Sequence, residues 1–143
     1  AFATAVVSAN AQSSNKLVAH IPFQYVVGDK AMVSGEYELR AAGSNGVALI
    51  VQSTNAKRSA IRLTTAIESP ASQRPKTTRP RLVFHRYGER YFLAEVWSGG
   101  DRTGLQLLKS RQERATEREL ARISPKGDSR PAYESVEVLA LNR

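Results

Sequence analysis

The sequence has no cysteine in its 143 residues, which excludes disulfide bonds, thiolate catalysis and cysteine-ligated zinc within them. It also has no apolar run close to the roughly 20 residues that a membrane-spanning helix needs. Its nine glycines and six prolines are too few for a collagen-like repeat or a low-complexity disordered chain. With 41% apolar and 24% charged residues, the chain instead has the composition of a folded globular domain.

Two common catalytic motifs are also missing. Neither the Gly-x-Ser-x-Gly of α/β-hydrolases nor the His-Glu-x-x-His of metalloproteases occurs. The two histidines, His20 and His85, could form a catalytic or metal-binding pair only on neighbouring strands, with a further ligand or an orienting carboxylate. Glu117 and Glu119 are two positions apart in an expected helix, so they do not face each other. We therefore expect a protein that is not an enzyme and has no metal site and no cofactor.

What the sequence does have is a strong positive charge. Its 21 basic and 13 acidic residues give a formal net charge of +8. Half of this excess lies in residues 73–102, which contain seven basic residues and three acidic ones. The candidate anion-binding residues are Arg74, Lys76, Arg79, Arg81, Arg86 and Arg90. The candidate aromatic contacts beside them are Tyr87, Tyr91 and Trp97.

A basic, proline-rich loop next to aromatic side chains can hold an acidic polymer by charge and by stacking. The expected partners are therefore an acidic polysaccharide, a lipopolysaccharide or an acidic protein surface. Nucleic acid is not expected, because the sequence has no motif of the known nucleic-acid-binding folds.

The hydrophobic pattern predicts an all-β fold. Alternation with a period of two, bounded by turn residues, predicts strands at residues 17–27, 36–40, 47–52, 60–67, 82–87, 91–97 and 134–141. Connections of hairpin length predict mainly antiparallel pairing. We expect a β-sandwich or open barrel of seven or eight strands with one late α-helix.

The clearest hairpin lies around Gly88-Glu89, because glycine suits the first position of a two-residue type II′ turn. This loop places Phe84 opposite Leu93 and His85 opposite Phe92. Both faces of the hairpin carry apolar side chains, so we expect both to be covered. In the preceding hairpin, alternation places the apolar side chains of residues 61, 63 and 67 on one face.

The helix is predicted over residues 110–122, which contain no glycine, no proline and only one β-branched residue. Ser110 is the expected N-cap, with Glu113 at the position of a capping box. The apolar stripe is thin, so we expect a largely solvated helix; its members are Ala115, Leu120 and Ala121.

Residues 1–11 are expected to be a signal-peptide remnant. Small and apolar side chains lead to Ala9-Asn10-Ala11, an Ala-x-Ala pattern typical of signal-peptidase sites. Their period-two alternation leaves a second interpretation, a retained N-terminal strand. Residues 12–143 are then a single β-rich domain with a periplasmic or extracellular location.

Six phrases within residues 17–123 are specific as a set. They are AHIPFQYVVG at 19–28, SGEY at 34–37, LVFHRYG at 82–88, YFL at 91–93, SR at 110–111 and ERELA at 117–121. On these phrases the chain resembles a group of small exported β-rich hypothetical proteins of soil bacteria. The resemblance implies export and a compact β domain, and it implies no activity.

Two functions of different classes follow from these expectations. The first is an exported, non-catalytic β domain that binds an anionic envelope component or a protein partner. The alternative is a structural subunit of an extracellular surface assembly or fibre. Such a subunit would self-associate through an edge strand by β-strand addition.

Overall fold

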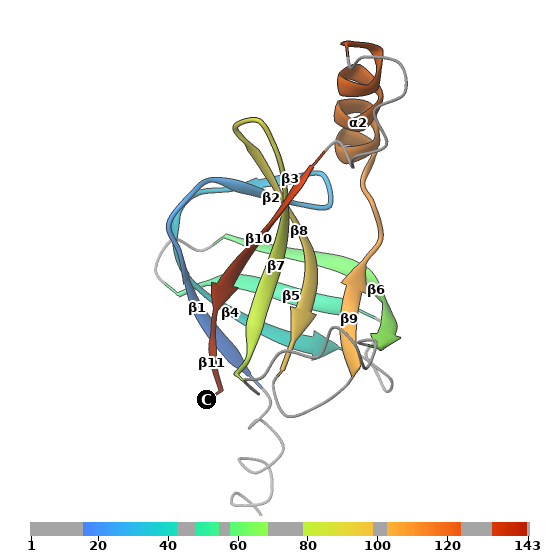
Figure 1. Cartoon of the computed structure of the whole chain (residues 1–143). Helices are drawn as coiled ribbons and strands as arrows, with labels where there is room; N and C mark the ends of the chain where they lie inside the picture. The colour runs from blue at the N-terminus through green and yellow to red at the C-terminus, as the bar shows by residue number, and fades with distance from the viewer. Residues whose placement is uncertain are drawn as a thin grey trace, which may run out of the picture.

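The computed structural model describes residues 16–42, 48–54, 58–68, 79–98, 103–123 and 133–142. These residues form eleven strands and one helix (Figure 1): β1 (Leu17–Ile21), β2 (Tyr25–Val27), β3 (Lys30–Met32), β4 (Gly35–Ala42), β5 (Ala48–Ser53), β6 (Ser59–Glu68), β7 (Arg81–Tyr87), β8 (Arg90–Trp97), β9 (Thr103–Leu107), α2 (Arg111–Ile123), β10 (Glu134–Leu139) and β11 (Leu141–Asn142). The all-β class, mainly antiparallel with one late helix, is confirmed. The expected signal-peptide remnant lies outside the described residues.

The strands follow one path, β10-β7-β8-β9-β6-β5-β4-β1-β11. The strands form two layers, and two segments pair with strands of both. β6 pairs with β5 through residues 59–63 and with β9 through residues 64–68. The last segment pairs with β7 as β10 and with β1 as β11. In Figure 1, β7, β8 and β10 cross in front of β4, β5 and β6, as in orthogonally packed sheets whose corner strands belong to both layers.

Pro22 divides the strand that alternation predicts over residues 17–27. β1 ends at Ile21 and pairs with β4, whereas β2 begins at Tyr25 and pairs with β3 and β8. Proline has no N–H for a sheet ladder, so the chain bends there and changes partners. Gly28, at φ 63°, then turns β2 into β3.

The β7–β8 hairpin has the predicted register. Phe84 lies opposite Leu93, His85 lies opposite Phe92, and the turn glycine Gly88 has φ 64°. A β-bulge interrupts the ladder between Val83 and Phe84. Both faces of the hairpin are covered, as the sequence indicates, since most of its side chains are buried.

Aromatic rings connect the two layers in the core. Phe84 packs edge-on against Phe23 at 5.0 Å and against Tyr25 at 5.4 Å between ring centroids. Tyr25 in turn packs edge-on against Tyr37 at 5.3 Å. The hairpin is thereby joined to β2 and β4.

One apolar face points away from this core. Ile61 and Leu63 share a face, as alternation predicts, but they are 69% and 56% exposed. Ala60 and Thr64 of the same strand are buried instead. The period of two establishes which side chains share a face, and here the smaller, less apolar set packs inward.

β9 is a strand that the sequence reading missed. The sequence predicts a glycine-rich turn at residues 98–103, whereas β9 begins at Thr103 and Gly104 pairs with Ile67. A Cβ atom on Gly104 would lie 2.6 Å from two ring carbons of Trp97. The glycine is therefore required by the close approach of an indole ring rather than by a turn.

This close approach predicts a packing defect in Gly104→Ala. Overpacking of this kind lowers the free energy of unfolding by about 1–3 kcal/mol, which urea denaturation measures. In a Trp97→Leu background the same alanine should have a smaller effect, because the ring that it meets is gone. An equal loss in both backgrounds would contradict the steric account.

Candidate functional site

Helix α2 begins where the sequence predicts. The Glu113 N–H donates to Ser110 Oγ at 3.0 Å, so Ser110 is the N-cap. The linker before the helix is held by Arg62, whose guanidinium donates to the carbonyl oxygens of Leu108 and Lys109 at 3.1 and 3.0 Å. In Figure 1 the helix stands at one end of the sheet, next to the β2–β3 hairpin.

The buried face of α2 is polar. Its buried residues are Glu113 and Thr116. The Glu113 carboxylate accepts a hydrogen bond from the Tyr87 hydroxyl at 2.8 Å, and the same oxygen lies 2.9 Å from His85 Nδ1. Tyr133 stacks on the His85 ring at 3.8 Å between centroids. Burial, followed by the Glu113 contact, raises the pKa of Tyr87, so its hydroxyl is a donor at neutral pH.

A second, more exposed pair supports this attachment. Lys109 Nζ lies 2.7 Å from Glu117 Oε2, and the Tyr87 hydroxyl reaches the same oxygen at 3.4 Å. The Lys109 ammonium lowers the pKa of Glu117, so the stability from this carboxylate is lost as pH falls through the lowered value. Glu117 raises the pKa of Lys109, so the lysine's contribution is lost only at strongly alkaline pH.

The Glu113–His85 pair has the geometry of a base with its orienting carboxylate. Within the described residues, however, the hydrogen-bond partner found for the His85 ring is Glu113. The same residues contain no group of three or more metal-ligating side chains. His20 is exposed on β1, which pairs with β4 and β11, whereas His85 is on β7, which pairs with β8 and β10. The two histidines are thus not on neighbouring strands, and His85 fastens the helix to the sheet.

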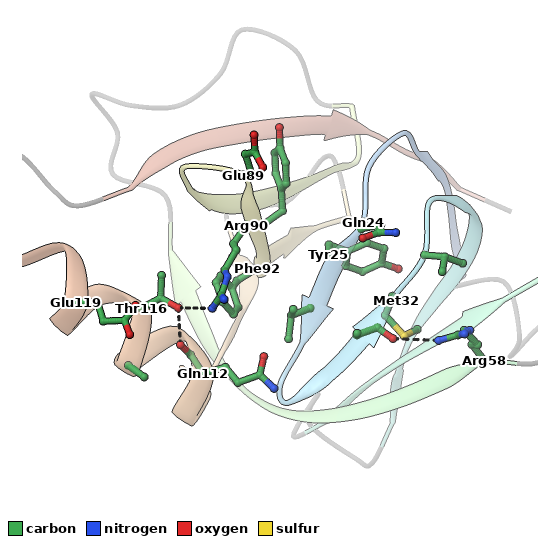
Figure 2. Close-up of a pocket in the computed structure, with 15 residues that line it drawn as sticks. Gln24, Tyr25, Met32, Arg58, Glu89, Arg90, Phe92, Gln112, Thr116 and Glu119 are labelled. Atoms are coloured by element: carbon green, nitrogen blue, oxygen red, sulfur yellow. Dashed lines mark hydrogen bonds between the residues drawn. The ribbon is translucent and has the colours of Figure 1, made fainter.

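A pocket of about 560 Å³ opens between α2 and the β2–β3 hairpin (Figure 2). Gln112 Nε2 donates to the Asp29 carbonyl oxygen at 3.2 Å and so joins the helix to the β2–β3 turn. Apolar lining residues come from the strands and from the connection between β3 and β4: Tyr25, Val26, Ala31, Met32, Val33, Tyr91 and Phe92. Polar and small lining residues complete the walls: Gln24, Arg58, Glu89, Arg90, Gln112, Ala115, Thr116 and Glu119.

Two arginines reach into this pocket without a carboxylate partner. Arg90 Nη1 donates to Thr116 Oγ1 at 3.4 Å, and Arg58 Nη1 donates to the Ala31 carbonyl oxygen at 3.4 Å. Neither forms an ion pair with any residue of the described ranges. Figure 2 shows Arg90 directed toward the helix and Arg58 on the side of the β2–β3 hairpin. Both long contacts leave most of each guanidinium available for a ligand.

The basic residues singled out from the sequence do not form one patch. Arg74 and Lys76 lie outside the described residues, and Arg79 is exposed. Arg81 Nε lies 2.9 Å from Glu137 Oε2, with its guanidinium 4.9 Å from the centre of the Trp97 ring. Arg86 and Arg90 lie about 20 Å away, at the other end of the β7–β8 hairpin.

The three candidate aromatic contacts differ in exposure. Tyr87 and Trp97 are buried, and Trp97 Nε1 donates to Glu95 Oε1 at 2.9 Å. Tyr91 is half-buried and stacks on Phe23 at 3.8 Å. These rings therefore belong to the core and its margin, and only Tyr91 lines the pocket.

The helical half of the pocket had one signal in the sequence. Gln112, Ala115, Thr116 and Glu119 recur at the spacing of one helix face. The sequence predicts a largely solvated helix because its apolar stripe, which includes Ala115, is thin. In the structure this face lines the pocket, although Gln112, Ala115 and Glu119 are exposed.

No protein-family model, curated protein or solved structure matches the chain. The geometry of the pocket and the charge of the chain are therefore the grounds on which a function is proposed.

Proposed function

We propose that this chain is a non-catalytic binding module that takes an anionic ligand with an apolar body in the pocket between α2 and the β2–β3 hairpin. One observation carries the proposal: Arg58 and Arg90 line the pocket without an ion-pair partner among the described residues, together with the apolar side chains of Tyr25, Met32 and Phe92. Export, and an anionic component of a cell envelope as the natural ligand, belong to the same proposal.

The size and lining of the pocket support a small ligand. Sites for small molecules typically have volumes of about 300–1,000 Å³, apolar walls and a few convergent polar groups. The pocket's volume of about 560 Å³ lies in this range. Arg58 and Arg90 are both exposed, and a guanidinium binds an anion by charge-assisted hydrogen bonds.

The charge of the whole chain supports an anion. A net charge of +8 raises the local concentration of anions and speeds their association. Among the partners expected from the sequence, a lipopolysaccharide joins phosphate groups to acyl chains. The phosphates would contact the two arginines, and the acyl chains would contact the apolar lining of the pocket. A polysaccharide or an acidic protein surface offers charge without a comparable apolar part.

The alternative of a fibre subunit stays a prediction with less support. Among the described strands, β10 is the longest that pairs on one side only, and it has six residues. It also contributes Glu134 and Glu137 to ion pairs with β7. Edge strands with charged side chains are typical of sheets that resist further strand addition.

The proposal is tested with two fluorescent probes that share an aromatic body. We expect 8-anilinonaphthalene-1-sulfonate to bind more tightly than N-phenyl-1-naphthylamine, which lacks the sulfonate. Arg90→Gln should weaken the sulfonate probe about tenfold and leave the neutral probe unchanged, because a charge-assisted contact is lost. Ala115→Trp should block both probes, since the exposed Ala115 side chain lines the pocket.

Two control variants on the same helix distinguish probe binding in the pocket from attraction by the net charge of the chain. Arg118→Gln removes an exposed arginine, and Ala121→Trp adds an exposed ring, at positions that do not line the pocket. Both variants should bind the probes as the parent chain does. Equal loss in Arg118→Gln and Arg90→Gln, or equal affinity for the two probes, would contradict the proposal.

A further inference from the structure

Helix α2 carries a row of arginines on the side opposite its buried residues. At 3.6 residues per turn, these four side chains lie within about 80° of one another around the helix axis, and the buried Glu113 and Thr116 lie on the other side. The row extends for about 16 Å along the axis. All four side chains are exposed, and together they are called the arginine ridge: Arg111, Arg114, Arg118 and Arg122.

The charge of the arginine ridge is not neutralised by ion pairs. Within the described ranges, none of its four members forms one. The carboxylates of the same helix are directed elsewhere: Glu113 is buried, Glu117 is bound by Lys109, and Glu119 lines the pocket. The ridge therefore presents a line of guanidinium groups to an external anion.

The surroundings of the ridge distinguish between classes of anionic partner. Stable protein interfaces have an apolar core, and a helix that lies on a membrane has an apolar face. The ridge has neither, because its exposed neighbours are the small Ala115 and Ala121, and the exposed Ile123 lies about 100° around the helix from Arg122. Single-stranded nucleic acid is commonly held by stacking on aromatic rings, and α2 contains no aromatic residue.

We propose that the arginine ridge of α2 binds an acidic polysaccharide lengthwise, with carboxylates of the sugar chain meeting successive guanidinium groups. A guanidinium and a carboxylate match each other in paired, charge-assisted hydrogen bonds. A sugar chain repeats its charges along a line and brings no apolar part, which fits a line of arginines without large apolar neighbours. This site is separate from the pocket and does not depend on the function proposed for it.

The test uses polygalacturonate as the acidic chain and dextran as the neutral one. The parent chain should bind polygalacturonate at low salt, release it as salt is raised, and ignore dextran. Arg114→Gln combined with Arg118→Gln removes the two central charges of the ridge and should weaken binding about tenfold. Glutamine forms helices about as well as arginine, so α2 should stay intact, which circular dichroism checks.

A matched control removes the same charge from another part of the chain. Arg40→Gln combined with Lys16→Gln changes an exposed residue of β4 and the residue before β1, and neither lies on α2 or lines the pocket. This variant should bind polygalacturonate within twofold of the parent. Equal losses in the two double variants would show that only the net charge attracts the polymer, and would overturn the inference.

Fragment length tests the lengthwise arrangement. Affinity for oligogalacturonides should rise with length until a fragment reaches all four arginines, because each further contact is then made within one complex. A single galacturonate that binds as tightly as the long fragments would contradict this arrangement.

Two other polyanions test the class of partner. Vesicles of anionic phospholipid represent a membrane surface, and polyglutamate represents an acidic protein. We expect both to bind more weakly than polygalacturonate. Tighter binding of either one that is lost in the Arg114→Gln, Arg118→Gln variant, or no binding of polygalacturonate by the parent chain, would overturn the assignment to a polysaccharide.

Discussion

Phe84→Ala should lower the free energy of unfolding by about 3–5 kcal/mol, which is a large part of the 5–15 kcal/mol typical of a domain. Phe84 is 0% exposed, and its ring meets Phe23 and Tyr25 edge-on. Removing it leaves a cavity where the β7–β8 hairpin meets β2. In thermal unfolding the midpoint should fall by about 10 °C or more.

Ile61→Ala is the matched control, because it also truncates a large apolar strand residue. Ile61 is mostly exposed on the outer face of β6, so its loss should change stability by about 0.5 kcal/mol or less. If the two variants unfold at similar temperatures, the assignment of inner and outer faces is wrong for one of these strands.

The β7–β8 hairpin could be predicted in detail because its register depends on local chemistry. A two-residue loop at Gly88 fixes which side chains lie opposite each other, and both strands carry strongly apolar side chains. The helix start was predictable for the same reason, since the N-cap bond of Ser110 spans three residues. Because these interactions join residues close together in the sequence, few other registers or helix starts are compatible with them.

Features that depend on distant neighbours could not be predicted in this way. The need for glycine at position 104 becomes visible only when the Trp97 ring is placed against it. The apolar Ile61 and Leu63 indicate a buried face until the other layer is known to pack against the opposite side of β6. In each case the deciding contact comes from another strand.

The candidate site shows the same limit. Spacing along the chain placed Arg81 and Arg86 in one basic region, but the length of β7 separates them. Glu113 was expected to complete a capping box, whereas its carboxylate contacts Tyr87 and His85 of β7. The pocket arises where α2 meets β2 and β3; the lining residues of α2 share one helix face, but that spacing does not predict which strands the face meets.

Glu113→Ala should release α2 from the sheet and open the pocket. The substitution leaves the buried Tyr87 hydroxyl and His85 ring without their shared acceptor, so the free energy of unfolding should fall by about 3 kcal/mol. Hydrogen exchange should show lost protection at the amides of α2, while β4 and β5 stay protected. Binding of the sulfonate probe should fall with it, because the helix forms one wall of the pocket.

Two comparisons make this expectation specific to the buried carboxylate. Glu113→Gln keeps one acceptor oxygen in the same place and should lose less stability than the alanine variant. Glu119→Ala removes an exposed carboxylate from the same helix and should keep the protection of the helix amides. If α2 stays protected in Glu113→Ala, the helix is held by other contacts, such as those of Arg62 and Gln112, and the buried cluster is not its main attachment.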